Sequence, residues 1–134
     1  MINAYQIIGN NKRKLSELEV MDNIRQGLPV KVLNTLSKEM TLSKDKVCEV
    51  LGLSSRTINR RTKLNKDEAD KLYRLARIFA LAINVLEDKS QAIKWLNTPK
   101  VALDHKIPLE LMDTEIGSRE VEKLLNRIEY GIYS

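Results

Sequence analysis

The sequence predicts an all-α protein organised around a helix-turn-helix, and three observations support that fold class. Apolar residues recur every three to four positions along most of the 134 residues, which is the spacing of helix faces. Gly and Pro are scarce, at five and three. Aromatic residues make up only 4% of the chain, so the core must come mainly from Leu, Ile, Val, Ala and Met, the usual filling of helical proteins.

Residues 1–14 show only weak structural signals, and we expect a flexible N-terminal arm. Their apolar members, either extended or loosely docked, are Ile2, Tyr5, Ile7 and Ile8. Ser16 and Glu19 have the spacing of a capping box, which predicts that a helix begins there and runs to Gly27. The apolar residues expected to line its inner face are Leu15, Leu18, Met21 and Ile24.

A second helix is predicted after Pro29, because proline is tolerated in a first helical turn. Its apolar residues at helical spacing are Val32, Leu33, Leu36 and Met40. This helix leads directly into the segment from Ser43 to Lys63.

The segment from Ser43 to Lys63 has the pattern of a helix-turn-helix. Ser43 is a good N-cap, and an apolar stripe follows it at Val47, Cys48 and Leu51. Gly52 stands where a positive φ would end the first helix, so the turn is only a few residues long. The small side chain of Cys48 suits the close approach of two short helices.

The second helix of this motif, predicted from about Ser55 to Thr62, has a single clearly apolar residue, Ile58. Its exposed side chains match the edges of bases in a DNA major groove, with Arg suited to guanine and Asn to adenine. The candidate DNA-binding residues are Ser54, Ser55, Arg56, Thr57, Asn59, Arg60 and Arg61, with the two serines on phosphates. The alternative interpretation is a plain helical hairpin with a solvated basic face.

A long helix is predicted from Asn65 to about Glu87, because a capping residue precedes acidic residues in the first turn. Its second half is apolar on most sides, so it must be buried on most sides. The C-terminal segment or a second copy of the chain would cover it, and we therefore expect a homodimer. The helix-turn-helix domain would span residues 15–66, and the long helix with a C-terminal domain residues 67–134.

Beyond the long helix, the pattern predicts three shorter pieces. These are a helix from Ser90 to Asn97, a turn from Pro108 to Met112, and a last helix from Ser118 to about Ile128. We expect Trp95 to fill the core. Residues 129–134 include two of the four tyrosines, so they either contact a partner or fold back onto the last helix.

Charge separates the two halves of the chain. Residues 1–66 carry 13 basic and 6 acidic residues, whereas residues 67–134 carry 10 and 12. A basic first half suits a phosphate backbone, and an acidic second half indicates a different partner. With one Cys, one His and no run of membrane-helix length, we expect a cytoplasmic protein without disulfide, metal site or cofactor, and not an enzyme.

The C-terminal half contains an ordered series of short motifs. They are Trp95-Leu96-Asn97-Thr98-Pro99, Ala102-Leu103, Pro108-Leu109-Glu110-Leu111, Thr114-Glu115-x-Gly117, Val121-Glu122-x-Leu124-Leu125 and Arg127-Ile128-Glu129-Tyr130-Gly131-Ile132-Tyr133. This series resembles the toxin-binding domain of Xre/MbcA/ParS-type antitoxins. The helix-turn-helix is similar to theirs through Leu51-Gly52-Leu53-Ser54-x-Arg56-Thr57-Ile58-x-Arg60-Arg61, as is Glu68-Ala69-Asp70-x-Leu72-x-Arg74-Leu75-Ala76-Arg77 after it. One departure is Asp104-His105, where the family often has a Gly-Gly-like pair.

The resemblance implies an antitoxin of a type II toxin-antitoxin module, most often paired with an RES-domain toxin that depletes NAD. The antitoxin would cover the NAD site of the toxin and repress its own operon. The positions that carry over to the toxin face are Arg127, Glu129, Tyr130, Gly131, Ile132 and Tyr133. Arg127 could equally pair with Glu122 or Glu129. The alternative function is a stand-alone transcription regulator whose C-terminal half is a dimerisation module.

Overall fold

A computed structural model describes residues 2–9, 15–129 and 131, and this part of the chain is all helical. The fold class predicted from the sequence is therefore confirmed. The α-helices are α1 (Ala4–Gly9), α2 (Glu17–Gln26), α3 (Lys31–Glu39), α4 (Lys44–Leu51), α5 (Ser55–Asn59), α6 (Lys66–Leu86), α7 (Lys89–Leu96) and α8 (Glu115–Glu129). Two 3-10 helices, η1 (Val101–Leu103) and η2 (Pro108–Leu111), lie between α7 and α8.

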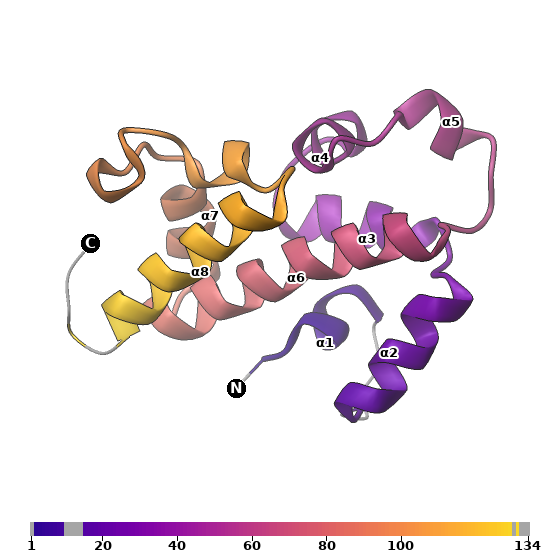
Figure 1. The fold of residues 1–134 in the computed structure, drawn as a ribbon, viewed down its shortest axis with the longest axis horizontal. Helices are drawn as coiled ribbons and strands as arrows, with labels where there is room; N and C mark the ends of the chain where they lie inside the picture. The colour runs from indigo at the N-terminus through magenta and orange to yellow at the C-terminus, as the bar shows by residue number, and fades with distance from the viewer. Residues whose placement is uncertain (1, 10–14, 130, 132–134) are drawn as a thin grey trace.

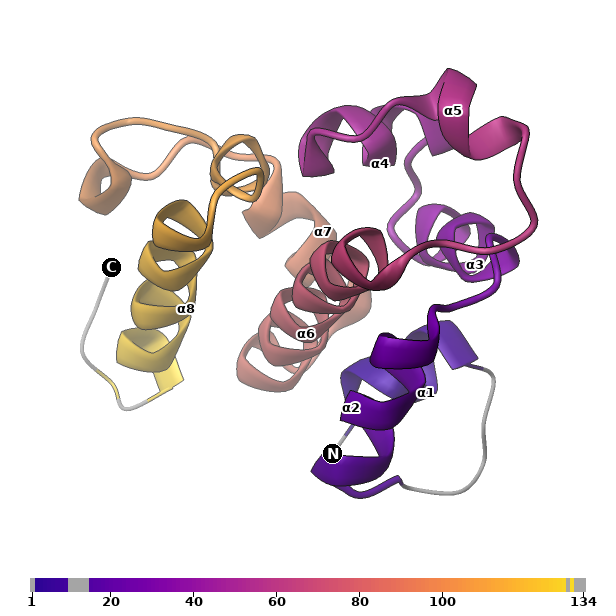
Figure 2. The ribbon, with the colours of Figure 1, turned by 45° about the vertical axis from the view of Figure 1, so that its right-hand side comes forward.

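Helix α6 is the centre of the molecule, as Figures 1 and 2 show. It begins with the capping box that the sequence predicts, because Asn65 and Glu68 each accept a hydrogen bond from the other's backbone N–H. It contacts α1 and α2 on one side and α7 and α8 on another, while α4 lies near its N-terminal half. The buried residues of α6 are Ala69, Leu72, Leu75, Ala76, Ile78, Phe79, Ala80 and Ala82.

The N-terminal segment differs from the flexible arm predicted for residues 1–14. Residues 4–9 form α1, and its Ala4, Ile7 and Ile8 are buried against α6 and α3. The side chain of Asn84 in α6 also accepts from the backbone N–H of Ile2 and donates to its carbonyl, at 3.2 and 2.7 Å. Residues 10–14 lie outside the described residues.

The packing shows which elements cover the apolar second half of α6. Burial there comes from α1, α7 and α8 of the same chain, because a helix apolar on several sides is stabilised by covering each of them. A second copy of the chain is not needed to explain the buried residues. The homodimer stays a prediction.

Helix α2 has the capping box predicted at Ser16, but its inner face agrees only in part with the prediction. Val20 is buried, Met21 and Ile24 are half-buried, and Leu18 is 69% exposed. Because α2 contacts mainly α6, only a narrow stripe of the helix is covered, and Leu18 lies outside it. No helix in the described ranges has the length and apolar character that crossing a membrane requires.

Candidate functional site

Helices α4 and α5 with the turn between them form the predicted helix-turn-helix. The hydroxyl of Ser43 caps α4 by accepting from the backbone N–H of Lys46, at 3.0 Å. Gly52 ends α4 in the left-handed conformation, with φ 68° and ψ 32°, which costs glycine no steric penalty. The hydroxyl of Ser54 then caps α5 by accepting from the backbone N–H of Thr57.

A small apolar cluster holds the two helices together. Ile58 of α5 is fully buried, as are Val47, Cys48 and Leu51 of α4. Burial also raises the pKa of the Cys48 thiol, so this residue stays neutral and packs as a small apolar side chain. The role predicted for Ile58, as the single apolar anchor of α5, is confirmed.

Helix α5 is shorter than predicted, since it ends at Asn59 and not near Thr62. The chain leaves the helix to pair with the loop between α2 and α3. The backbone N–H of Val30 donates to the carbonyl of Thr62 at 2.9 Å, and that of Leu64 donates to Leu28 at 2.7 Å. Leu28 and Leu64 are both buried, so apolar burial and backbone pairing together outweigh another helical turn.

The candidate DNA-binding residues therefore occupy three kinds of position. Arg56, Thr57 and Asn59 are exposed on α5, and Arg60 is the exposed C-cap residue. Ser54 and Ser55 lie at the start of the helix, and the hydroxyl of Ser54 is already used in capping. Figure 2 shows α5 at the outer edge of the molecule, away from α8.

Arg61 is held differently from its neighbours, because its guanidinium forms an ion pair with Glu68 of α6. The hydrogen bond from Arg61 is the main reason why the pKa of Glu68 is lowered, and the same bond raises the pKa of Arg61. Glu68 also belongs to the capping box of α6. The pair therefore connects the end of the helix-turn-helix to the central helix, a contact that the sequence analysis missed.

The C-terminal candidate residues are only partly described. Arg127 and Glu129 lie exposed in the last turn of α8, and Gly131 has a left-handed φ of 75°, with no atom of the described residues within 4 Å of where a Cβ atom would lie. Tyr130, Ile132 and Tyr133 lie outside the described residues. Glu122, one possible partner of Arg127, instead accepts two hydrogen bonds from Arg77 of α6, at 3.0 and 3.1 Å.

The loop between α7 and η2 explains the departure at Asp104 and His105. Both residues adopt left-handed backbone conformations, with φ of 57° and 63°, which glycine adopts without strain. Hydrogen bonds between the backbones of Lys100 and Lys106, and from His105 to Lys100, close the loop. The loop thus keeps a backbone suited to a Gly-Gly pair, although this chain has larger residues there.

Close packing explains why glycine occupies position 117. A Cβ atom at this position would lie 2.1 Å from the carbonyl oxygen of Leu111, so η2 and α8 could not keep their close approach. The backbone N–H of Gly117 also donates to the hydroxyl of Thr114 at 3.0 Å. The block Thr114-Glu115-x-Gly117 therefore builds the junction between η2 and α8.

Two large apolar side chains in the C-terminal half are strongly exposed, Val101 of η1 at 78% and Ile116 of α8 at 73%. Neither residue was a candidate from the sequence. Periodicity could have identified Ile116, since it falls outside the apolar stripe of α8 that Val121, Leu124 and Leu125 form. Trp95 is buried as predicted, with the Lys100 ammonium 4.7 Å from the centre of its ring.

Comparison with known proteins matches two successive parts of the chain to family models. A family model described as the antitoxin Xre-like helix-turn-helix domain matches residues 19–77. A second model, described as the antitoxin Xre/MbcA/ParS C-terminal toxin-binding domain, matches residues 81–131. The first ends within α6 and the second contains α7 and α8.

Full-length similarity agrees with these domain matches. A protein named antitoxin Xre from Yersinia enterocolitica is 30% identical over 120 residues, which cover 86% of this chain and 81% of the relative. Proteins of the same name from Photorhabdus laumondii and Pseudomonas putida are 30% and 31% identical over 116 and 119 residues. These matches cover 83% and 87% of this chain, and 78% and 74% of the relatives. Together with the helix-turn-helix and the helical C-terminal region, they show that the chain belongs to the Xre family of toxin-antitoxin antitoxins.

Proposed function

We propose that this antitoxin acts in the cytoplasm, where it neutralises an NAD-depleting RES-domain toxin and represses its own operon as a homodimer. The observation that carries the proposal is the pairing of two modules on one central helix. One exposes a polar and basic recognition helix, and the other matches a toxin-binding domain over residues 81–131.

For DNA binding, α5 would enter the major groove of the operator. Arg56, Thr57 and Asn59 supply donors and acceptors for base edges, and Arg60 at the C-cap supplies positive charge. Ser54 and Ser55 begin the helix, where backbone N–H groups suit a phosphate. Arg61 would contact DNA only with the part of its guanidinium that Glu68 leaves free.

A homodimer would place two copies of α5 on two half-sites. Dimeric helix-turn-helix proteins read operators in this way, because two-fold symmetry in the protein matches two-fold symmetry in the site. Molar mass in solution tests this part of the proposal. A monomer at high micromolar concentration would remove it.

For neutralisation, we propose that residues 127–133 bind the toxin. Arg127 is exposed, forms no ion pair with any described residue, and lies at the end of α8 that leads to Tyr130, Ile132 and Tyr133. A pocket for a dinucleotide must accept a flat ring and two phosphates, and aromatic side chains with an acidic or basic neighbour suit such a pocket. Glu129 and Gly131 complete the segment.

The experiment is co-expression with the protein encoded beside this chain, with growth and cellular NAD followed together. The full chain should restore growth and NAD, whereas a chain lacking residues 130–134 should restore neither if those residues block the toxin. A harmless neighbour would refute the antitoxin pairing and favour a stand-alone regulator. Full rescue by the truncated chain would refute only the role of residues 130–134.

A further inference from the structure

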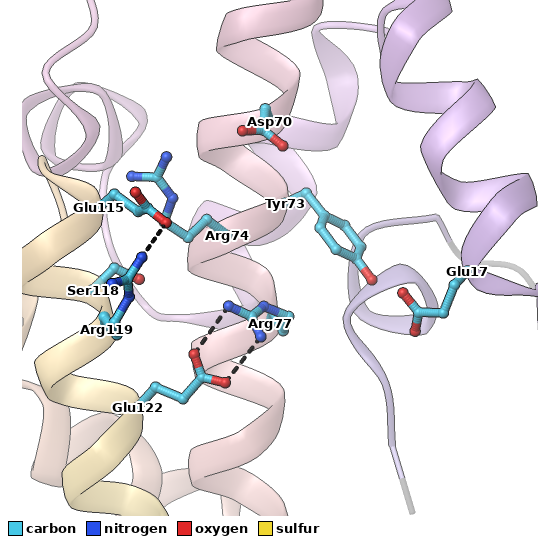
Figure 3. A pocket seen from close by; sticks show the side chains of 9 residues that line it. All are labelled: Glu17, Asp70, Tyr73, Arg74, Arg77, Glu115, Ser118, Arg119 and Glu122. Atoms are coloured by element: carbon cyan, nitrogen blue, oxygen red, sulfur yellow. Dashed lines mark hydrogen bonds and ion pairs between the residues drawn. The ribbon is translucent and has the colours of Figure 1, made fainter.

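A polar groove of about 540 Å³ lies on the surface between α6 and α8 and reaches α2 (Figure 3). Arg74 and Arg77 of α6 line it on one side. Its other side comes from α8, through Glu115, Ser118, Arg119 and Glu122. This volume falls within the range of protein sites that bind small molecules or side chains of a partner.

Most of the charges in the groove are already paired. Arg77 donates two hydrogen bonds to Glu122, and Arg119 donates one to Glu115 at 2.8 Å. Arg74 is the exception among the arginines of the groove, because its half-buried side chain forms no ion pair or hydrogen bond with any residue in the described ranges. Two further carboxylates, Glu17 and Asp70, border the groove toward α2, where the ring of Tyr73 lies between α6 and Glu17 (Figure 3).

Ser118 adds a second unused donor. Its side chain is 1% exposed, and its hydroxyl is buried without a hydrogen-bond partner among the described residues. The backbone N–H of Ser118 donates to the carbonyl of Thr114, but the hydroxyl forms no hydrogen bond with the part of the chain that the structure describes. Buried hydroxyls are normally paired, so an unpaired one that lines a groove marks a position for an acceptor from outside.

We propose that Arg74 and Ser118 bind a carboxylate side chain, Asp or Glu, of the bound toxin. A guanidinium offers two parallel N–H donors that match the two oxygens of a carboxylate, and the Ser118 hydroxyl adds a third donor. The proposal rests on the proposed function, because it requires a toxin partner.

The position of the groove supports the toxin as the partner, because the α8 side of the groove lies within the matched toxin-binding domain. Arg74 and Arg77 belong to the segment matched by the helix-turn-helix model, whereas Ser118 and Arg119 belong to the matched toxin-binding domain. A toxin carboxylate in this groove would therefore contact both modules of the antitoxin at once.

The test is the Kd of the full chain for the purified toxin encoded beside it, measured by calorimetry. Arg74→Gln should raise Kd by about 10- to 100-fold, the usual effect of removing one partner of a charged hydrogen-bonded pair. Ser118→Ala should raise it by about fivefold. Arg25→Gln is the matched control, since Arg25 is an exposed arginine on α2 outside this groove, and its Kd should equal that of the wild type.

Ser118→Ala also separates recognition from folding. Removing a buried hydroxyl that has no partner should leave the melting temperature unchanged or raise it, even while toxin binding weakens. A lower melting temperature with an unchanged Kd would show that the hydroxyl is structural and would overturn its role here.

Other outcomes distinguish a failure of the proposed function from a failure of the inference about Arg74 and Ser118. A wild-type chain that binds no toxin refutes the proposed function and this inference with it. A tight complex with the same Kd for wild type and Arg74→Gln refutes the inference alone. Inorganic phosphate and acetate are the probes for a small-anion site. If either shifts the NMR signals of Arg74 and Ser118 while Arg74→Gln leaves the toxin Kd unchanged, the site is for small anions and the toxin assignment is wrong.

Discussion

Replacing His105 by glycine should stabilise this protein, although glycine usually destabilises. His105 has a left-handed φ of 63° and an exposed side chain, so the substitution removes strain and little packing. A left-handed conformation costs an L-residue about 1–2 kcal/mol, with His near the lower end. Glycine also has more conformational freedom in the unfolded chain. This stabilises the unfolded state by about 0.4–1 kcal/mol and offsets part of the energy gained by removing strain.

The balance predicts a stabilisation of about 0.5 kcal/mol by His105→Gly, or a rise of roughly 2 °C in melting temperature for a chain of this size. Thermal and urea unfolding measure it. Gln91→Gly is the matched control, because Gln91 is exposed within α7, and there glycine should cost about 0.5 kcal/mol. If both substitutions destabilise equally, the loop does not adopt the backbone described here and the reasoning is wrong.

Three further predictions follow from the packing and the ion pairs. Ile58→Ala should destabilise by about 3 kcal/mol, because it empties a fully buried position between α4 and α5, and it should weaken operator binding; urea unfolding and fluorescence anisotropy with labelled operator check both. Glu68→Gln should flatten the acid dependence of stability. The pKa of Glu68 is lowered by Arg61, so its contribution is present above the ordinary glutamate pKa and is lost as pH falls through the folded value, which urea midpoints at several pH values will show. Gly117→Ala should destabilise by more than about 2 kcal/mol, since its Cβ would meet the Leu111 carbonyl, and calorimetric unfolding should show it.

The sequence predicted the helix ends and turns that depend on residues close together in the chain. Capping boxes identified the starts of α2 and α6 at Ser16 and Asn65, and Gly52 identified the turn of the helix-turn-helix. Ile58 was recognised as the anchor of α5 because it is the only apolar residue on that short helix. Each of these depends on residues within one or two helical turns of each other.

Features that depend on distant packing could not be predicted in the same way. Helix α1 is six residues long, too short to be stable alone, and it exists because Ile7 and Ile8 pack against α6. Leu18 has the spacing of a buried residue but lies outside the narrow contact with α6. The pairing of Arg77 with Glu122 joins residues 45 positions apart, so the groove around Arg74 is visible only in the folded chain.

We propose that one chain carries two separable activities, DNA binding through α5 and toxin neutralisation through its C-terminal region. The most direct test measures growth rescue from the neighbouring toxin for two variants side by side, with operator binding as the companion readout. We expect the double variant Arg56→Ala and Arg60→Ala to rescue growth but to lose operator binding. Deletion of residues 130–134 should abolish rescue and leave operator binding intact. Loss of rescue by the α5 variant, at unchanged stability and expression, would show that the two activities are not separable.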